Sequence, residues 1–407
     1  MPGALSHIRV LDLTRILAGP WCTQILADLG ADVIKVERPG MGDDTRQWGP
    51  PWIKDKEGNP TTDSSYYSST NRNKRSITVD MSKPEGQALV KELAAKSDVL
   101  VENYKVGDLK RYGLSYEDLA AINPRLVYCS ITGYGQTGPY RDRPGYDFVF
   151  QGEGGLMSIT GERDEWGGGP QKVGIAVTDV LTGLYATIAI TSALEARNVT
   201  GRGQYIDTAL LDTIVAFGGN QAANYLVSGD IPKRWGNAHV NIVPYQVFKT
   251  KNGHIIVAVA NDNQFKKLCE VLGRPQLGMD ERFNSVPKRT IDRDVLVPLL
   301  QEALLEQDSE YWLEAFTKNG IPHGPINNYK QVFEHPQVLA RGLRVDMPNH
   351  GAGGSVPVIA SPLRLSDTPV SYRRPPPTLG QHTQEVLKDV LGKSAADLDA
   401  LATRKII

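Results

Sequence analysis

The chain has 407 residues, and its 45 Lys and Arg residues against 46 Asp and Glu residues leave a formal net charge of −1. This near-balance excludes the strongly basic surfaces that bind nucleic acid or anionic membranes. No apolar run approaches the roughly eighteen residues of a membrane span, and residues 1–6 leave no room for a signal or transit peptide before the first predicted strand. We therefore expect a cytoplasmic α/β protein without nucleic-acid or membrane partners.

The cysteines indicate a reducing compartment and no metal. Cys22, Cys129 and Cys269 are far apart in sequence and lie in apolar stretches. Such cysteines are typical of reduced core thiols in intracellular proteins. No Cys and His spacing resembles a metal site, so we predict none.

The first forty residues predict a βαβ unit. Residues 8–13 and 31–37 form apolar strands, and residues 21–29 between them form a helix. This order favours a parallel sheet. The first loop lacks the G-x-G-x-x-G pattern, which argues against an NAD-dependent dehydrogenase although Glu37 stands where a dinucleotide fold would hold a ribose. Arg38 suits a phosphate, with a plain surface arginine about equally favoured.

Further strands end in polar or glycine-rich segments. Strands are expected at 77–80, 99–101 and 126–132, with a helix at 84–96. Because loops after parallel strands gather at one edge of the sheet, we expect Asn103, Lys105, Arg111 and the 133–139 loop to share a crevice.

A largely apolar helix begins at Thr178-Asp179 and runs to Ala196. Asp179 is its only acid before Glu195. A carboxylate in the first turn lies in the positive field of the helix N-terminus, which favours the ionised form. On this evidence alone, the residue is a capping residue more readily than a reactive group.

The second half of the chain predicts a small α+β domain. A long helix over 210–227 precedes a linker at 228–232 and an unusual polar loop at 234–242. A hairpin follows at 247–259, then helices near 263–272, 291–306 and 309–319. Strands near 343–347 and 356–365 and helices at 380–391 and 394–403 complete the chain. We expect a large domain at 1–227, the small domain with its linkers at 228–330, and a return to the large domain at 331–407.

The whole chain resembles the class III (CaiB/BaiF, formyl-CoA transferase-like) CoA-transferases from about residue 7 to residue 392. The matching segments, in the family's order, are 12–15 with 18–20, 31–40, 73–77, 101–103, 133–135 with 138–139, 145–147, Asp179 with 182–183, 236–239 and 379–383. The segments 129–139, 243–246 with 249–251, and 324–328, with the triple proline at 375–377, look like the succinyl-CoA:glutarate (hydroxymethylglutarate) CoA-transferase branch.

The resemblance implies a fold and a set of site residues. The fold is a Rossmann-like large domain built from both chain ends with an inserted small domain, and two chains form an interlocked homodimer. Asp179 matches the family's nucleophile, Tyr146 would lie beside the thioester, and Gly236, Asn237 and His239 belong to a substrate-side loop. CoA contacts carried over from the family fall on Ala18, Arg38, Asn103, Lys105, Arg111 and Asp147.

The implied reaction moves CoA from an acyl-CoA, with succinyl-CoA as donor, to a small dicarboxylic acid such as glutarate or hydroxymethylglutarate. It passes through an aspartyl anhydride and an aspartyl-CoA thioester and uses no tightly bound cofactor. The glycine loops, 236–242 foremost and Gly167–Gly169 second, are candidates for excluding water, although a triple glycine is more often a surface turn. Formyl-CoA transferases have His and Gln where this chain has Arg15 and Leu17, so we predict that Arg15 binds the distal carboxylate of a dicarboxylate.

Two alternatives remain open. An α-methylacyl-CoA racemase needs an acid and a base beside the α-carbon, and its histidine would stand where this chain has Tyr146. A tyrosine with a pKa of about 10 is a poor base at neutral pH. A non-catalytic CoA-binding protein is the second alternative, and the retained Asp179 and glycine loops argue against it.

Overall fold

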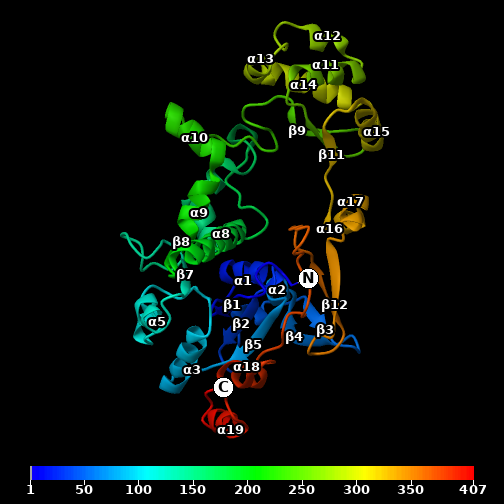
Figure 1. The fold of residues 1–407 in the computed structure, drawn as a ribbon. Coiled ribbons are helices and arrows are strands. Elements are labelled where there is room, and N and C mark those ends of the chain that lie inside the picture. The colour runs from blue at the N-terminus through cyan, green and yellow to red at the C-terminus, as the bar shows by residue number, and fades with distance from the viewer. Residues whose placement is uncertain (1) are drawn as a thin grey trace. The chain divides into compact units, whose positions relative to one another are not determined.

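A six-stranded parallel sheet is the centre of the larger of two compact units in the computed structural model, which describes residues 2–407. Its strands lie in the order β5-β2-β1-β6-β7-β8 (Figure 1). The strands are β1 (Arg9–Asp12), β2 (Asp32–Glu37), β5 (Lys74–Thr78), β6 (Val99–Glu102), β7 (Val127–Thr132) and β8 (Tyr205–Ala209). The predicted mixed α/β fold with a parallel sheet is confirmed.

The strand order predicts a binding crevice between β1 and β6. Taken along the chain, the strands of this sheet stand in the order third-second-first-fourth-fifth-sixth, the doubly wound arrangement. β1 pairs with β2 on one side and with β6 on the other, so the chain reverses its direction of travel between β1 and β6. Ligands of such sheets bind outside the carboxyl ends of the strands at this reversal.

Helices cover both faces because the strands are apolar on both. One face packs Val10, Val33 and Val101 against α1 (Ala18–Asp28) and α8 (Val177–Thr200). The other packs Leu11, Ile34 and neighbouring strand residues against helices from both ends of the chain. Those helices are α3 (Pro84–Ala95), α4 (Asp108–Arg111), α5 (Tyr116–Ile122), α18 (Thr383–Leu391) and α19 (Ala395–Thr403).

Helices α1 and α8 approach each other closely at Gly183. A Cβ at this position would lie 2.7 Å from the carbonyl oxygen of Ala18 and 3.1 Å from Cβ of Trp21. Glycine therefore lets the first turns of α1 and α8 meet. By length and composition, α8 is also the one helix of residues 2–407 that is apolar enough to cross a membrane, and 44% of its most apolar window is buried against the rest of the protein.

The C-terminal segment completes the larger unit beside β5. The backbone N–H of Asn73 donates to the carbonyl of Arg374 (2.8 Å), and Thr383 Oγ1 accepts from the N–H of Thr78 (3.0 Å). Arg373 donates to the carbonyls of Ala27 (2.8 Å) and Gly30 (3.1 Å) at the end of α1. The strands β12 (Arg344–Pro348) and β13 (Ser355–Ile359) form an antiparallel pair before this segment.

The smaller unit consists of residues 157–172 and 224–338 and has its own core. Its antiparallel sheet has the order β11-β10-β9, and the predicted hairpin is confirmed as β9 (Tyr245–Lys249) and β10 (His254–Ala258). The other elements are η2 (Asp164–Trp166), α11 (Asp262–Val271), α12 (Pro275–Met279), α13 (Val286–Ile291), α14 (Arg293–Leu304), α15 (Ser309–Asn319), β11 (His323–Pro325), α16 (Tyr329–Glu334) and α17 (Pro336–Ala340), the last of which continues past the unit's boundary.

Several elements differ from the sequence expectations. Glycines at 218–219 divide the expected helix 210–227 into α9 (Leu210–Phe217) and α10 (Gly219–Ser228). Residues 157–172, which the sequence analysis placed with the large domain, lie in the smaller unit. Elements that were not predicted are η1 (Asp44–Gln47), β3 (Trp52–Lys54), β4 (Pro60–Ser64), α2 (Ser65–Ser68), α6 (Asp147–Glu153) and α7 (Leu156–Ile159).

Candidate active site

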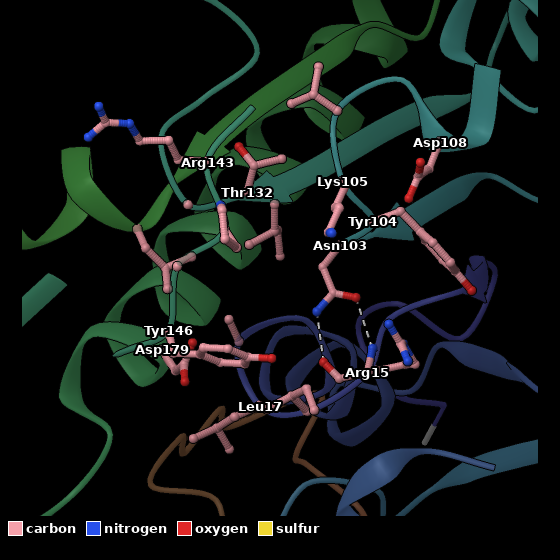
Figure 2. A pocket seen from close by; sticks show the side chains of 18 of the residues that line it. Arg15, Leu17, Asn103, Tyr104, Lys105, Asp108, Thr132, Arg143, Tyr146 and Asp179 are labelled. Atoms are coloured by element: carbon pink, nitrogen blue, oxygen red, sulfur yellow. Dashed lines mark hydrogen bonds between the residues drawn. The ribbon is translucent and has the colours of Figure 1, made fainter. Parts of the chain in front are cut away.

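A cavity of about 540 Å³ opens in the larger unit where the sheet order reverses (Figure 2). Its walls come from the loops after β1, β6 and β7, from the segment before α6 and from the first turn of α8. It is lined by Arg15, Ile16, Leu17, Ala18, Asp44, Trp48, Asn103, Tyr104, Lys105, Val106, Asp108, Ile131, Thr132, Gly133, Arg141, Asp142, Arg143, Pro144, Gly145, Tyr146, Asp179 and Leu210. Six of the predicted site residues, Arg15, Ala18, Asn103, Lys105, Tyr146 and Asp179, therefore share one cavity.

Asp179 lies in the first turn of α8 and is half-buried at the wall of this cavity. Burial, with a further contribution from the nearby carboxylate of Asp147, raises its pKa to about 7. The expectation that the helix N-terminus would favour the ionised form is wrong in its net effect, because desolvation and like-charge repulsion outweigh the helix field. Near neutral pH, Asp179 therefore exchanges between its acid and its carboxylate.

Asp147 holds the start of α8 in place. It accepts hydrogen bonds from the backbone N–H of Thr178 (2.7 Å) and from Nε2 of Gln151 (2.7 Å). Because these donors fix its carboxylate next to Asp179, Asp147 is well placed to set the charge of its neighbour. It lies beside the cavity, outside the residues that line it.

Two tyrosines accompany the Asp179 carboxyl group. Tyr146 precedes α6, lines the cavity and has 68% of its surface exposed. Tyr66 was not predicted; burial and the carboxylates of Asp179 and Asp147 raise its pKa to about 12. The hydroxyl group of Tyr66 thus retains its proton at neutral pH and is not a base for proton abstraction.

The loop after β1 is held by buried groups beneath it. Ile16 has φ +74°, an unusual conformation for a β-branched residue. Its N–H donates to Oδ1 of Asp43 (3.2 Å), and Lys35 Nζ bridges Asp43 Oδ2 (2.9 Å) and the carbonyl of Thr14 (2.8 Å). Strained backbone held in this way is typical of functional sites.

Asn103 fixes the backbone of Arg15 from the neighbouring strand end. Its Oδ1 accepts from the N–H of Arg15 (2.9 Å) and its Nδ2 donates to the carbonyl of Arg15 (2.7 Å), as the dashed lines in Figure 2 show. The reciprocal pair ties the loops after β1 and β6 together. Beside it, α1 begins at Ala18 with no side-chain cap, so the first backbone N–H groups of this helix have no partner within it.

The remaining predicted CoA contacts lie outside the cavity lining. Arg38 is exposed directly after β2, and Arg111 is exposed and pairs with Asp108 of the lining. Glu37, where a dinucleotide fold would hold a ribose, is buried and occupied by Arg46 (2.7 Å) and Ser76 (2.6 Å). This pairing removes Glu37 from any ligand role.

The predicted substrate-side loop belongs to the smaller unit. Gly236 has φ +58° and its N–H donates to the carbonyl of Gly161 (3.0 Å). The His239 ring packs against Tyr245 with 5.3 Å between ring centroids, and Asn237 lines a separate cavity of about 570 Å³. Gly168 closely approaches Glu162: a Cβ there would lie 2.2 Å from its carbonyl oxygen.

Several residues of the site escaped the sequence analysis. They include Asp44, Trp48, Tyr104, Thr132 and Arg143 of the cavity lining. Thr132 ends β7 and Tyr104 follows β6, so the position at a strand end was an available signal for both. Asp44 and Trp48 carried no such signal, because they follow a turn. Among residues 2–407, no group of three or more His, Cys, Asp or Glu side chains has the arrangement of a metal site.

Comparison with known proteins identifies the family of the chain. Residues 5–383 match CoA-transferase family III. The chain belongs to this family. A succinate–glutarate CoA-transferase of Agrobacterium fabrum is 48% identical over 386 residues, which cover 95% of each chain. A succinyl-CoA:glutarate CoA-transferase of Homo sapiens is 49% identical over 387 residues, covering 95% of this chain and 86% of that protein.

Two solved structures have the same fold. The crystal structure of a CaiB/BaiF family protein from Brucella suis superposes with a TM-score of 0.84 at 48% identity, covering 96% of this chain and 100% of that one. Rv3272 from M. tuberculosis gives a TM-score of 0.82 at 30% identity, covering 94% and 99%. The predicted family and the assignment as a CoA-transferase are confirmed.

Proposed function

We propose that the protein transfers CoA from succinyl-CoA to glutarate or to a similar small dicarboxylate. The relatives named for this reaction support the substrate pair. The observation that carries the proposal is that a half-buried carboxyl group, Asp179, and a half-exposed arginine side chain, Arg15, line one cavity at the sheet reversal. The carboxyl group suits the acyl chemistry, and the guanidinium suits the second carboxylate of a diacid.

The first half-reaction releases the donor acid. The Asp179 carboxylate attacks the thioester carbonyl of succinyl-CoA, the C–S bond breaks, and CoA leaves as its thiolate, giving a mixed aspartyl–succinyl anhydride. The thiolate then attacks the aspartyl carbonyl of this anhydride. Succinate leaves with the bonding electron pair, and Asp179 carries CoA as a thioester.

The second half-reaction repeats these steps in reverse with the acceptor. A glutarate carboxylate attacks the aspartyl thioester, the thiolate leaves again, and a glutaryl anhydride forms. Attack of the thiolate on the glutaryl carbonyl yields glutaryl-CoA and frees the Asp179 carboxylate. Each nucleophile is an anion, so no proton transfer to a separate base is needed.

The chemistry sets two requirements on the site. Asp179 must be ionised to attack, and its pKa of about 7 makes this fraction sensitive to pH. The anhydride carbonyls need N–H donors and protection from water. We assign the donor role to the uncapped first turn of α1 at Ala18 and the water exclusion to the 236–242 loop, with Gly236, Asn237 and His239.

We further propose that Arg38, Asn103, Lys105, Arg111 and Asp147 serve the CoA side of the site, with Tyr146 beside the thioester. Asn103 would do so indirectly, since its amide group holds the Arg15 backbone. No tightly bound cofactor enters this scheme, and the free buried cysteines are compatible with a cytoplasmic location.

The assembly we infer is a homodimer, with the smaller unit as a domain inserted into the larger. The supporting observation is an apolar surface on α8, where Leu184, Tyr185 and Ile188 are exposed at 41, 47 and 59%. Exposed apolar groups gathered on one helix in this way are typical of an interface between subunits.

The racemase alternative fits the site less well. It needs a base at the position of Tyr146, and tyrosine, with an ordinary pKa of about 10, is a poor base at neutral pH. A non-catalytic CoA-binding protein would have no use for a carboxyl group held at a raised pKa in the cavity.

The test is an acceptor panel with succinyl-CoA as donor and mass detection of new acyl-CoAs. We expect glutaryl-CoA from glutarate, and a CoA adduct on the peptide that contains Asp179 when the enzyme is quenched without acceptor. Succinyl-CoA left untouched with every acid would remove the donor assignment. Incorporation of solvent deuterium at the α-carbon without CoA exchange would favour the racemase.

Arg15 can be tested separately. Arg15→Gln removes the guanidinium that we pair with the distal carboxylate, so KM for glutarate should rise about tenfold or more while KM for a monocarboxylic acid changes little. Equal effects on both acids would refute the pairing.

A further inference from the structure

Asp44 forms an ion pair with the guanidinium group of Arg15 at the wall of the cavity. Nη1 of Arg15 donates to Oδ2 of Asp44 at 3.0 Å, and both side chains line the cavity that contains Asp179. The Arg15 guanidinium also lies over the ring of Tyr104, 5.7 Å from its centroid. A carboxylate of the protein thus sits where the proposed substrate would place its own distal carboxylate.

Buried groups beneath the cavity hold the two loops that carry Arg15 and Asp44. Asp43, the residue before Asp44, caps η1 by accepting from the N–H of Thr45 (3.0 Å) and also accepts from the N–H of Ile16 (3.2 Å). Lys35 joins Asp43 to the carbonyl of Thr14. The loops that carry Arg15 and Asp44 are therefore fastened to each other through backbone groups next to both residues.

The two ion pairs of this region differ in exposure, and this difference separates their roles. Lys35 and Asp43 have side chains that are both 0% exposed, so breaking this pair would strand a buried charge. The side chains of Arg15 and Asp44 are 48% and 43% exposed, so Asp44 regains water when it lets go of Arg15. The Lys35–Asp43 pair is therefore a fixed part of the fold, whereas the Arg15–Asp44 pair can be replaced by a substrate carboxylate.

We propose that Asp44 determines acceptor specificity by competing with the substrate's distal carboxylate for Arg15. This proposal rests on the proposed function. A diacid brings a carboxylate that replaces Asp44, and Arg15 stays paired throughout. An acid with an apolar tail leaves the Arg15–Asp44 pair intact, so this acid gains no binding energy from Arg15. Asp44 thereby weakens the binding of dicarboxylates to a measurable extent and keeps the Arg15 guanidinium paired when no diacid is bound.

The expected magnitude follows from the exposure of the pair. Exposed ion pairs contribute up to about 1 kcal/mol, and removal of such a competitor corresponds to a gain in affinity of up to about fivefold. Asp44→Asn should therefore lower KM for glutarate and for succinyl-CoA by up to about fivefold. KM for pentanoate and butyryl-CoA, which match them in chain length but lack the distal carboxylate, should stay unchanged.

Asp142→Asn is the matched control. Asp142 also lines the cavity and pairs with an arginine, Arg141 (3.5 Å), on another loop. If Asp44 acted only through the total charge of the cavity, Asp142→Asn would lower KM for glutarate equally. In an Arg15→Gln background, Asp44→Asn should have no effect on any of these substrates.

The experiment measures KM and kcat for the four substrates with the wild type, the two single variants, Arg15→Gln and the Arg15→Gln/Asp44→Asn double variant. The proposal is supported if the decrease in KM appears only with the carboxylate-tailed substrates and vanishes in the double variant. It is overturned if KM for glutarate rises or stays constant in Asp44→Asn, or if butyryl-CoA responds as succinyl-CoA does. Calorimetry of glutarate binding to the wild type and to Asp44→Asn separates failure of this proposal from failure of the proposed function. Equal glutarate affinities of the two proteins would refute the competition. Absence of CoA transfer in the wild type would refute the proposed function.

Discussion

Replacing Asp179 by Asn should abolish turnover and at the same time stabilise the protein at alkaline pH. The amide cannot form the anhydride, so the rate of CoA transfer should fall by about a thousandfold or more, as for the loss of other covalent nucleophiles. The stability effect has a separate origin. The folded protein keeps Asp179 in surroundings that disfavour its charge, whereas the unfolded chain does not.

The magnitude follows from the two pKa values. The pKa of this carboxyl group is 3.8 in an unperturbed peptide and about 7 in the fold. Because the folded pKa is the higher one, folding is favoured below pH 4 and loses stability as the pH rises to about 7. At about 1.4 kcal/mol per pKa unit, the full loss is about 4 kcal/mol at pH 8. Since the cavity admits water to the half-buried group, we expect about 1–3 kcal/mol.

The assay compares thermal midpoints of wild type and Asp179→Asn at pH 8 and at pH 5. The variant should melt higher at pH 8, by about 1–2 °C for each kcal/mol in a chain of this length, and the gain should be at most about half as large at pH 5. Asp212→Asn is the control, because Asp212 is an exposed first-turn acid of α9 whose loss should change stability little. An equal gain at both pH values, or destabilisation at pH 8, would refute the reasoning.

Three further predictions concern the same unit. kcat/KM should fall about tenfold per pH unit below pH 7 as Asp179 is protonated, and Asp147→Asn should move this limb to lower pH; a flat profile between pH 5 and 8 would contradict the assignment. Gly183→Ala should cost about 1–3 kcal/mol and lower kcat, since its Cβ meets the carbonyl of Ala18 at 2.7 Å; unchanged melting would show that α1 and α8 separate easily. Lys74→Met should cost about 3–5 kcal/mol by leaving the buried Asp12 without its ion-pair partner at 3.1 Å, and a chemical denaturation midpoint equal to that of the wild type would contradict this.

The sequence predicted the helices and strands whose apolar residues either recur at a regular spacing or form an unbroken run. The strands β1, β6 and β7 are buried and largely apolar in their interiors because helices cover both faces of the sheet, and such runs stand out. The hairpin β3–β4 was missed because β3 has only three residues and β4, with the sequence Pro-Thr-Thr-Asp-Ser, has no apolar face. The break between α9 and α10 was missed although two consecutive glycines mark it.

The sequence predicted part of the cavity lining and none of its electrostatics. Asp179 was assigned from the resemblance to a family and Arg15 from a departure from that family's pattern, and both line the cavity. The pKa of Asp179 depends on Asp147, which is 32 positions away in sequence and comes near it only when α6 and α8 pack. Likewise, no pattern in the sequence pairs Arg15 with Asp44, because the contact depends on the buried tie through Lys35 and Asp43.

Helix α18, which packs beside β5, is synthesised late, and this order has a consequence for biosynthesis. Thr78 of β5 is joined to Thr383, 305 positions further along the chain. At a synthesis rate of roughly 5–20 residues per second, about 15–60 s pass on the ribosome before this partner exists. During that interval the edge strand β5 of the nascent polypeptide lacks its contacts with α18. The smaller unit, complete by residue 338, is free to fold first. Production of this protein should therefore depend on chaperone supply more than its final stability would suggest.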